Sequence, residues 1–165
     1  MTVEVLNIGT ELLLGSVVNT HAGWIAKRIF PLGLRVSRQT TVPDGPAIRE
    51  AVFEACGRAD IVFITGGLGP TTDDITREVV SELLGKKLHP SVEIRARIEA
   101  MLAARGREPV ERMFRQTMVP DGATVLQNRF GTAPGLYFPA VTQPSWASPH
   151  FFLLPGPPRE LQPMF

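Results

Sequence analysis

The sequence is poor in cysteine, with Cys56 as the single example among its 165 residues. One cysteine excludes an internal disulfide and any cysteine-rich metal cluster, and the helical pattern around Cys56 predicts a buried, unreactive thiol. His21, His89 and His150 are scattered without the spacing of metal ligands, so a zinc site is not expected. The sequence also lacks a nucleophile elbow, which excludes the commonest serine hydrolases.

An excess of charge of one sign is also missing, as is any long apolar run. The chain has 17 basic and 16 acidic residues, so its net charge of +1 gives no reason to expect nucleic acid or an anionic membrane as a partner. No apolar run approaches the length of a membrane span, and Met1–Glu4 lacks the basic start of a signal peptide. With 44% hydrophobic residues, the composition predicts one globular domain over residues 1–165, in the cytoplasm.

A buried-type strand and a glycine-rich turn dominate what the sequence does contain. Ile61–Ile64 are apolar and mostly β-branched or aromatic, which indicates a strand covered on both faces. Gly66, Gly67 and Gly69 follow, and they allow backbone angles that a Cβ forbids and let a ligand approach the main chain. The pattern predicts a phosphate-binding turn.

A helix is expected directly after this turn. Ile75, Val79 and Leu83 recur at helical spacing, and the side-chain oxygen of Thr72 or Asp73 is expected to cap the helix. The free N–H groups and the positive dipole of such a helix start favour phosphate, in agreement with the glycines.

The same segment departs from the common phosphate-binding loops. It has no Walker lysine and no third glycine of the dinucleotide fingerprint, and it places two acids, Asp73 and Asp74, where an anion should lie. Carboxylates repel phosphate unless a divalent cation lies between them. A helix cap with a solvated neighbour is an equally good interpretation of Asp73 alone, whereas the combination of glycines and acids favours function.

Two further acids follow expected strands. Residues 3–8 predict a first, central strand, and Glu11 lies in the glycine-bounded segment 9–15 that follows it. Glu11 is either a paired structural carboxylate or a site residue, and its place at a strand's carboxyl end favours the site. Asp44 follows a strand expected over 34–42, and it either caps the next helix or lines the same crevice.

Alternating strands and helices are expected along most of the chain. Together they predict an α/β fold in which a mainly parallel central sheet lies between helix layers. A helix is expected after Asn19, with Ala22, Ile25, Ala26 and Ile29 facing inward, and another after Asp44, with Ile48, Val52 and Ala55 facing inward. Further helices are expected over 91–105, over 110–118 and from Pro158. The remaining strands are expected over 123–126, 135–138 and 151–154. Segment 139–149 is expected to be an exposed loop, and Arg95, Arg97 and Arg105 to be a solvated helix face.

Several motifs then resemble one known family. They are Gly9-Thr10-Glu11-Leu12-Leu13-Leu14-Gly15, Val18-Asn19-Thr20, Gly66-Gly67-Leu68-Gly69-Pro70-Thr71 with Asp73, Asp74 and Thr76, and Leu154-Pro155-Gly156 with Pro158, Arg159 and Glu160. In this order and spacing they resemble the N-terminal domain of the CinA competence/damage-inducible family, within the MoaB/MogA-like molybdopterin-binding superfamily. The resemblance covers essentially the whole chain. It departs at His21, where the family more often has asparagine.

The resemblance implies a three-layer α/β/α sandwich of the molybdopterin-binding (MoaB/MogA-like) fold, usually a homo-oligomer (dimer or trimer). It implies that the glycine loop grips a pterin phosphate or a nucleotide pyrophosphate. Asp74 matches the aspartate needed for adenylyl transfer in MogA-like relatives, and Asp44 matches an aspartate that follows a Val/Ile-Pro pair. A full CinA adds a deamidase domain, and the helix expected from Pro158 has only a few residues before Phe165, so we expect a fragment of a longer protein.

The resemblance further implies a metal-dependent pyrophosphatase that splits ADP-ribose into AMP and ribose 5-phosphate. The alternatives are adenylylation of molybdopterin with MgATP, and a module that binds molybdopterin or a nucleotide without chemistry. The expected site comprises catalytic Asp74 and Asp73; phosphate-binding Gly66, Gly67, Leu68, Gly69 and Thr71; a divalent metal (Mg, Mn or Co class) on Asp73, Asp74, Glu11 and Asp44; and a pocket extended by Thr10, Asn19, Gly156 and Pro158.

Overall fold

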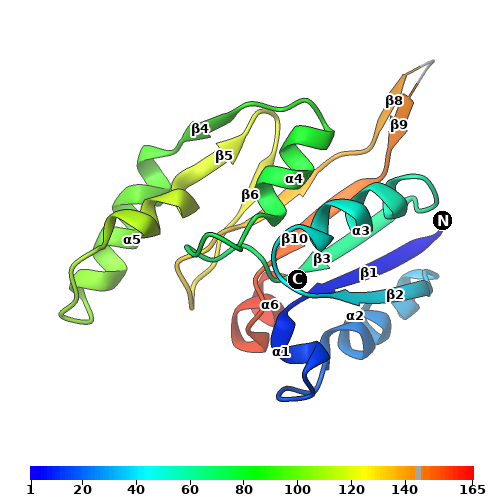
Figure 1. Cartoon of the computed structure of the whole chain (residues 1–165), viewed down its shortest axis with the longest axis horizontal. Coiled ribbons are helices and arrows are strands. Elements are labelled where there is room, and N and C mark those ends of the chain that lie inside the picture. The colour runs from blue at the N-terminus through cyan, green and yellow to red at the C-terminus, as the bar shows by residue number, and fades with distance from the viewer. Residues whose placement is uncertain (144–145) are drawn as a thin grey trace.

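A six-stranded mixed sheet forms the centre of the computed structural model, which describes residues 1–143 and 146–165 (Figure 1). The strand order is β2-β1-β3-β10-β7-β6, in which β2, β1, β3 and β10 are parallel and β7 runs antiparallel to its two neighbours. The sheet strands are β1 (Val3–Ile8), β2 (Val36–Val42), β3 (Ile61–Thr65), β6 (Thr124–Leu126), β7 (Gly135–Phe138) and β10 (His150–Leu154). The predicted α/β class and the mainly parallel sheet are confirmed.

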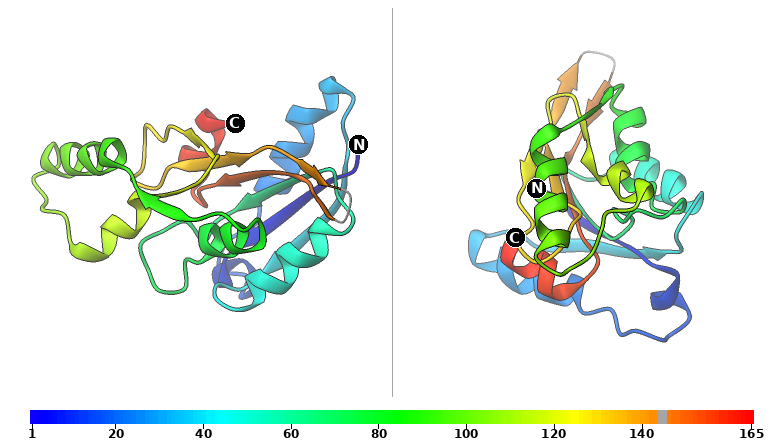
Figure 2. Two further views of the ribbon diagram at one scale, coloured as in Figure 1. Left: turned by 90° about the horizontal axis from the view of Figure 1, so that it is seen from above. Right: turned by 90° about the vertical axis from the view of Figure 1, so that its left-hand side faces the viewer.

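Helices cover both faces of this sheet (Figure 2). On one face α2 (His21–Ile29) and α6 (Pro158–Met164) pack on Val3, Val5 and Phe63. On the other, α3 (Ala47–Cys56) and α4 (Thr76–Leu83) pack on the alternate residues of the same strands, such as Leu6 and Ile64. Because successive side chains of a strand point to opposite faces, the central strands are mostly apolar on both faces, with Glu4 and Asn7 of β1 as buried polar exceptions. This produces the predicted three layers.

A smaller lobe projects beyond one edge of the sheet, at the left of Figure 1. It contains the two-stranded ribbon of β4 (Leu88–Pro90) and β5 (Met118–Pro120), the helix α5 (Val92–Ala103) and the 3₁₀ segment η2 (Glu111–Thr117). Ile94, Ile98 and Leu102 of α5 form its own small core. The helix over 91–105 is confirmed. The ribbon was not predicted, because its strands are too short to show a period.

Two local predictions are wrong. The segment expected to be an exposed loop over 139–149 contains a hairpin of β8 (Val141–Gln143) and β9 (Trp146–Ser148), although Pro144 and Ser145 lie outside the described residues. Neither Thr72 nor Asp73 caps α4, because the helix begins only at Thr76 and its N-cap position is Ile75, without a side-chain cap.

Ser91 provides a side-chain cap for a different helix, α5. Its Oγ accepts a hydrogen bond from the Ile94 backbone N–H at 3.3 Å, at the start of α5. Since loss of such a cap typically costs about 1 kcal/mol, we expect Ser91→Ala to lower the free energy of unfolding by about that amount. Thr72→Ala is the matched control, because the exposed Thr72 side chain makes no hydrogen bond to the described residues. Urea denaturation of both variants measures the difference, and equal stabilities would contradict the assignment.

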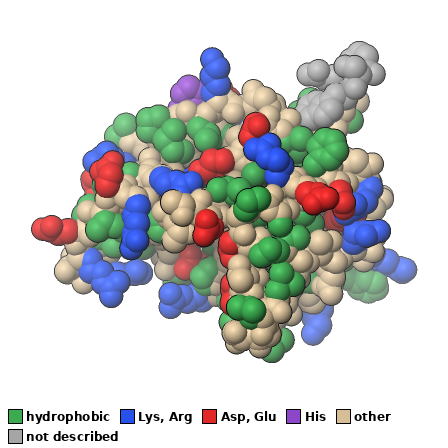
Figure 3. All heavy atoms as spheres, viewed as in Figure 1, with side chains coloured by type: hydrophobic (Ala, Val, Ile, Leu, Met, Phe, Trp, Pro, Cys, Tyr) green, Lys and Arg blue, Asp and Glu red, His purple; other side chains and the backbone are tan. Residues whose placement is uncertain are grey.

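Cys56 is half-buried at the end of α3, and burial raises the pKa of its thiol to about 11. A thiol with so high a pKa has almost no thiolate at neutral pH, which agrees with the predicted unreactive cysteine. On the outer surface, acidic and basic side chains intermingle on the face shown in Figure 3. Among the described residues, none of the helices combines the length and the apolar character needed to cross a bilayer.

Candidate functional site

The candidate site lies at the carboxyl ends of the parallel strands, where the direction of chain winding reverses. From β1 the chain passes through α2 to β2 on one side, and then through α3 to β3 on the other side of β1. Loops that leave β1 and β3 therefore separate and open a crevice, which is where open α/β sheets bind ligands. Gly9 and Gly66 are the first residues beyond β1 and β3.

The glycine loop, residues 66–72, is shaped by contacts that only glycine permits. Gly66 has φ +95°, and a Cβ there would overlap the carbonyl oxygen of Ile8, so the loop crosses directly over the end of β1. Gly67 has φ +66°, and a Cβ there would overlap Oγ1 of Thr76. That hydroxyl donates to the Gly66 carbonyl at 3.1 Å. The close approach fixes the backbone of the loop against the start of α4.

Two aspartates face this loop, and each is held by a threonine in the same way. Asp74 Oδ2 accepts hydrogen bonds from Thr71 N at 2.9 Å and from Thr71 Oγ1 at 2.5 Å. Asp44 Oδ2 accepts from Thr10 N at 2.9 Å and from Thr10 Oγ1 at 3.0 Å. Each Oδ1 makes no hydrogen bond to the described residues. Asp44 therefore does not cap α3, whose N-cap position is Pro46 without a side-chain cap, and its role in a site stays a prediction.

A cleft of about 410 Å³ joins these groups. Among the predicted site residues, it is lined by Gly66, Gly67, Leu68, Gly69, Asp74, Asp44, Glu11 and Gly156. Thr71 and Thr10 are not lining residues, and they hold the two aspartates that are. Glu11 is exposed rather than buried, on the short helix α1 (Thr10–Leu13).

Three further predicted residues do not line the cleft, and they do not hold its aspartates either. The exposed Asp73 side chain makes no hydrogen bond to the described residues, and only its backbone carbonyl is used, by Gly45 N at 3.2 Å. Asn19 Oδ1 accepts from His21 N at 3.1 Å, which orders the start of α2. Pro158 is the first residue of α6. The structure thus separates Asp74 from its neighbour, which sequence spacing alone could not do.

His21 reaches the site indirectly. Its Nε2 lies 2.5 Å from the Gly156 carbonyl oxygen, and because a carbonyl only accepts, this nitrogen carries the proton. The ring is buried, so the contact ties α2 to the loop after β10. His21 supports a lining residue of the cleft instead of reading the ligand itself.

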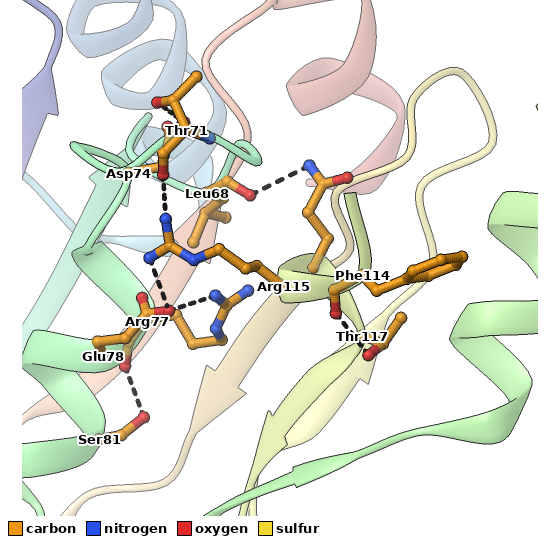
Figure 4. A network of polar contacts seen from close by, with 10 residues as sticks. Leu68, Thr71, Asp74, Arg77, Glu78, Ser81, Phe114, Arg115 and Thr117 are labelled. Carbon is orange, nitrogen blue, oxygen red and sulfur yellow. Dashed lines mark hydrogen bonds and ion pairs between the residues drawn. The ribbon is translucent and has the colours of Figure 1, made fainter. Parts of the chain in front are cut away.

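The lobe contacts the glycine loop through η2 (Figure 4). Arg115 donates to the Thr71 carbonyl and pairs with Glu78 at 3.5 Å, and Gln116 Nε2 donates to the Leu68 carbonyl at 3.3 Å. Gln116 is buried and lines the cleft. Both contacts use carbonyl groups of the loop. Because the carbonyl and the following N–H of a trans peptide point in opposite directions, the Gly69 and Thr72 N–H groups point away from the side chains that hold the loop.

Arginines supply positive charge to the cleft. Arg105, Arg107 and Arg159 line it, and none forms an ion pair within the described part of the chain. Sequence reasoning assigned Arg105 to a solvated face, named Arg159 only as part of a motif without a role, and did not consider Arg107. Arg107 lies in the turn after α5 and Arg159 in the first turn of α6, and only the fold brings them to the same cleft.

The side chains of the site can be compared with the ligands that a divalent cation requires. Within residues 1–143 and 146–165, no group of three or more acidic, histidine or cysteine side chains is arranged to hold a metal, which argues against an all-protein cage. Asp74 and Asp44 instead each present one fixed carboxylate with a free oxygen. That arrangement fits a Mg²⁺-type ion, which usually takes one or two carboxylates and completes its shell with phosphate oxygens and water.

Comparisons with known proteins show what the chain is similar to. Residues 4–165 match the family model described as "Probable molybdopterin binding domain". A CinA-like protein of Akkermansia muciniphila is 52% identical over 98% of the chain, and a protein of Symbiobacterium thermophilum named as competence-damage inducible is 46% identical over 100% of it. The chain spans 38% of the length of each of these two relatives.

Solved structures show the same fold. A structure titled as the protein CinA with unknown function, from Thermoplasma acidophilum, superposes with a TM-score of 0.85 at 29% identity, covering 99% of this chain and 94% of that one. A MoaB described as tungsten cofactor synthesizing, from Pyrococcus furiosus, superposes with a TM-score of 0.60 at 19% identity, covering 99% and 86%. The predicted molybdopterin-binding fold is confirmed.

Proposed function

The chain belongs to the molybdopterin-binding domain family as a CinA-like member, and from this premise we propose that its cleft binds a diphosphate and hydrolyses ADP-ribose to AMP and ribose 5-phosphate. The observation that carries the proposal is the composition of one cleft. It combines a glycine loop, two fixed aspartates and three arginines that form no ion pair with the residues that the structure describes. This is the donor set that a diphosphate and a cation require together.

Each group has a defined part in this reaction. The N–H groups of the loop and the arginines would hold the phosphate oxygens, on which negative charge builds in the transition state. Asp74 and Asp44 would hold the cation, which when bound polarises the phosphoryl group. Water attacks one phosphorus, a new P–O bond forms, and the bridging P–O bond breaks, so that each product keeps one phosphate. One acid, Asp74 or Glu11, would orient the water and accept its proton.

The direct test is to incubate the purified chain with ADP-ribose and, in turn, Mg²⁺, Mn²⁺ or Co²⁺. We expect equimolar AMP and ribose 5-phosphate, detected by chromatography, and loss of both products with EDTA. AMP without ribose 5-phosphate would indicate contamination by another hydrolase, and no product with any cation would contradict the proposal.

Adenylylation of molybdopterin is the second candidate. Its support is the likeness to MoaB-type structures, at identities that carry the fold alone. This reaction needs MgATP and a pterin, and it would transfer AMP to the pterin phosphate with release of pyrophosphate. Release of pyrophosphate from ATP that depends on molybdopterin would favour it. Binding of ATP or pterin with no turnover of any substrate would favour a module without chemistry.

A further inference from the structure

An exposed aromatic ring stands at the cleft. Phe130 lies in the loop between β6 and β7 and lines the cleft together with Gly131, Thr132 and Ala133. The residue is 51% exposed, whereas Phe138 at the end of β7 is buried. A single exposed phenylalanine needs no explanation on a convex surface. In a concave site, an exposed ring offers a flat apolar surface that a ligand can contact.

Asn128 holds the backbone on either side of this ring. Its Oδ1 accepts hydrogen bonds from Phe130 N at 3.0 Å and from Gly131 N at 2.8 Å. Its Nδ2 donates to the Ala133 carbonyl and to Glu160 Oε2, both at 2.8 Å. One amide thus uses its two acceptor and two donor positions on one loop and its support. The side chain is 1% exposed, so these bonds are shielded from water.

Arg97 holds the same loop from the lobe. Its guanidinium donates to the Asn128 carbonyl, to Gly131 O at 3.2 Å and to Thr132 O at 2.9 Å. Burial lowers the pKa of this arginine, so holding a charge there has a cost that the bonds to the loop offset. Sequence reasoning expected a solvated side chain, and the structure corrects that.

Glycine allows the loop to close on its support. A Cβ at Gly131 would overlap the Glu160 carboxylate. The loop therefore lies directly against α6 beside the exposed ring. A buried amide, a partly buried guanidinium and a carboxylate all serve to order a short loop, and a ring on an ordered loop loses little conformational entropy when a ligand binds.

We propose that Phe130 is a stacking platform for the planar nitrogen heterocycle of the ligand, a purine or a pterin, whose phosphate lies at the glycine loop. This rests on the proposed function for the phosphate end only. A flat ring accepts any heterocycle face, so the platform selects ligands that carry a base over those that carry phosphate alone. The cleft, at about 410 Å³, is of a size typical for one small-molecule ligand.

The test compares ligands with and without a base by calorimetry with Mg²⁺ present. We expect Phe130→Ala to lower the affinity for ADP about tenfold, in line with the usual contribution of a stacked base. The affinity for inorganic pyrophosphate should stay unchanged. Phe130→Trp should retain ADP binding, and Phe130→Leu, which keeps apolar area without an aromatic face, should not. Phe53→Ala is the matched control, because Phe53 is 68% exposed on α3 and does not line the cleft.

The outcomes separate the platform from the proposed function. Equal losses for ADP and pyrophosphate, an unchanged affinity for ADP, or full binding by Phe130→Leu would each overturn the platform alone. Adenosine and neopterin test it without any phosphate, through quenching of the new fluorescence in Phe130→Trp. Quenching without pyrophosphate binding would keep the platform and overturn the diphosphate site. Neither quenching nor pyrophosphate binding would overturn both. The heterocycle whose quenching saturates at the lower concentration is the preferred one.

Discussion

Asp74→Asn is expected to lower the rate of AMP release from ADP-ribose by about a thousandfold while leaving the fold intact. Asp74 is the acid that lines the cleft within the glycine loop's own turn, and Thr71 fixes its carboxylate with two hydrogen bonds. An amide in its place keeps the size of the side chain. It removes the negative charge that a cation or an attacking water requires, so chemistry is lost and packing is not.

The neighbouring acid provides the control for this prediction. Asp73→Asn removes the same charge one residue away, on an exposed side chain outside the cleft lining, and should retain most of the activity. The measurement is the initial rate of AMP formation, with circular dichroism and the urea midpoint to verify folding. Equal losses in the two variants would show that local charge matters and position does not, and normal turnover by Asp74→Asn would remove Asp74 from the reaction.

Gly66→Ala is expected to have the largest effect on stability, about 3 kcal/mol or more. A non-glycine residue in the left-handed region costs about 1–2 kcal/mol, and the new methyl group would also collide with the Ile8 carbonyl in the central strand β1. Neither partner of this collision is a flexible side chain. The loop must therefore move away from β1, and the cleft must change shape with it.

Gly33→Ala separates the two contributions. Gly33 also has positive φ, at +78°, but a Cβ there meets nothing within 4 Å. It should cost about 1–2 kcal/mol, from backbone conformation alone. Urea unfolding of both variants gives the difference, and similar free energies would mean that the crossing of β1 by the glycine loop is looser than described.

How much of the molecule could be predicted from sequence differs between its parts. The apolar runs of strands such as Val3–Ile8 and the helical spacing of apolar residues in the helices are local signals. The central sheet and its covering helices could therefore be foreseen. The glycine loop could be foreseen too, because glycines after a buried strand carry their own stereochemical meaning. Asp74 and Asp44 were candidates from their position after strands.

The remaining residues of the site could not be foreseen, for a physical reason. Arg97 and Asn128 act through contacts to segments 31 and 32 residues away. The local patterns around these two residues and Phe130 match those of an ordinary helix and loop. In the turn before α4, by contrast, the sequence predicted a contact that the structure does not contain. Thr71 and Asp74 bond to each other there, which delays the helix to Thr76 and leaves it without the predicted cap.

The hydrogen bonds from η2 to the glycine loop have a mechanical consequence. Arg115 and Gln116 belong to a lobe with its own small core, yet their partners are the carbonyls of Thr71 and Leu68, within the segment that would grip phosphate. Tilting the lobe away from the sheet would pull on these two anchor points, and clamping the segment would draw the lobe inward. Movement of the lobe is therefore coupled to movement of the glycine loop. A ligand that favours one position of the loop also favours one position of the lobe, and the reverse holds equally.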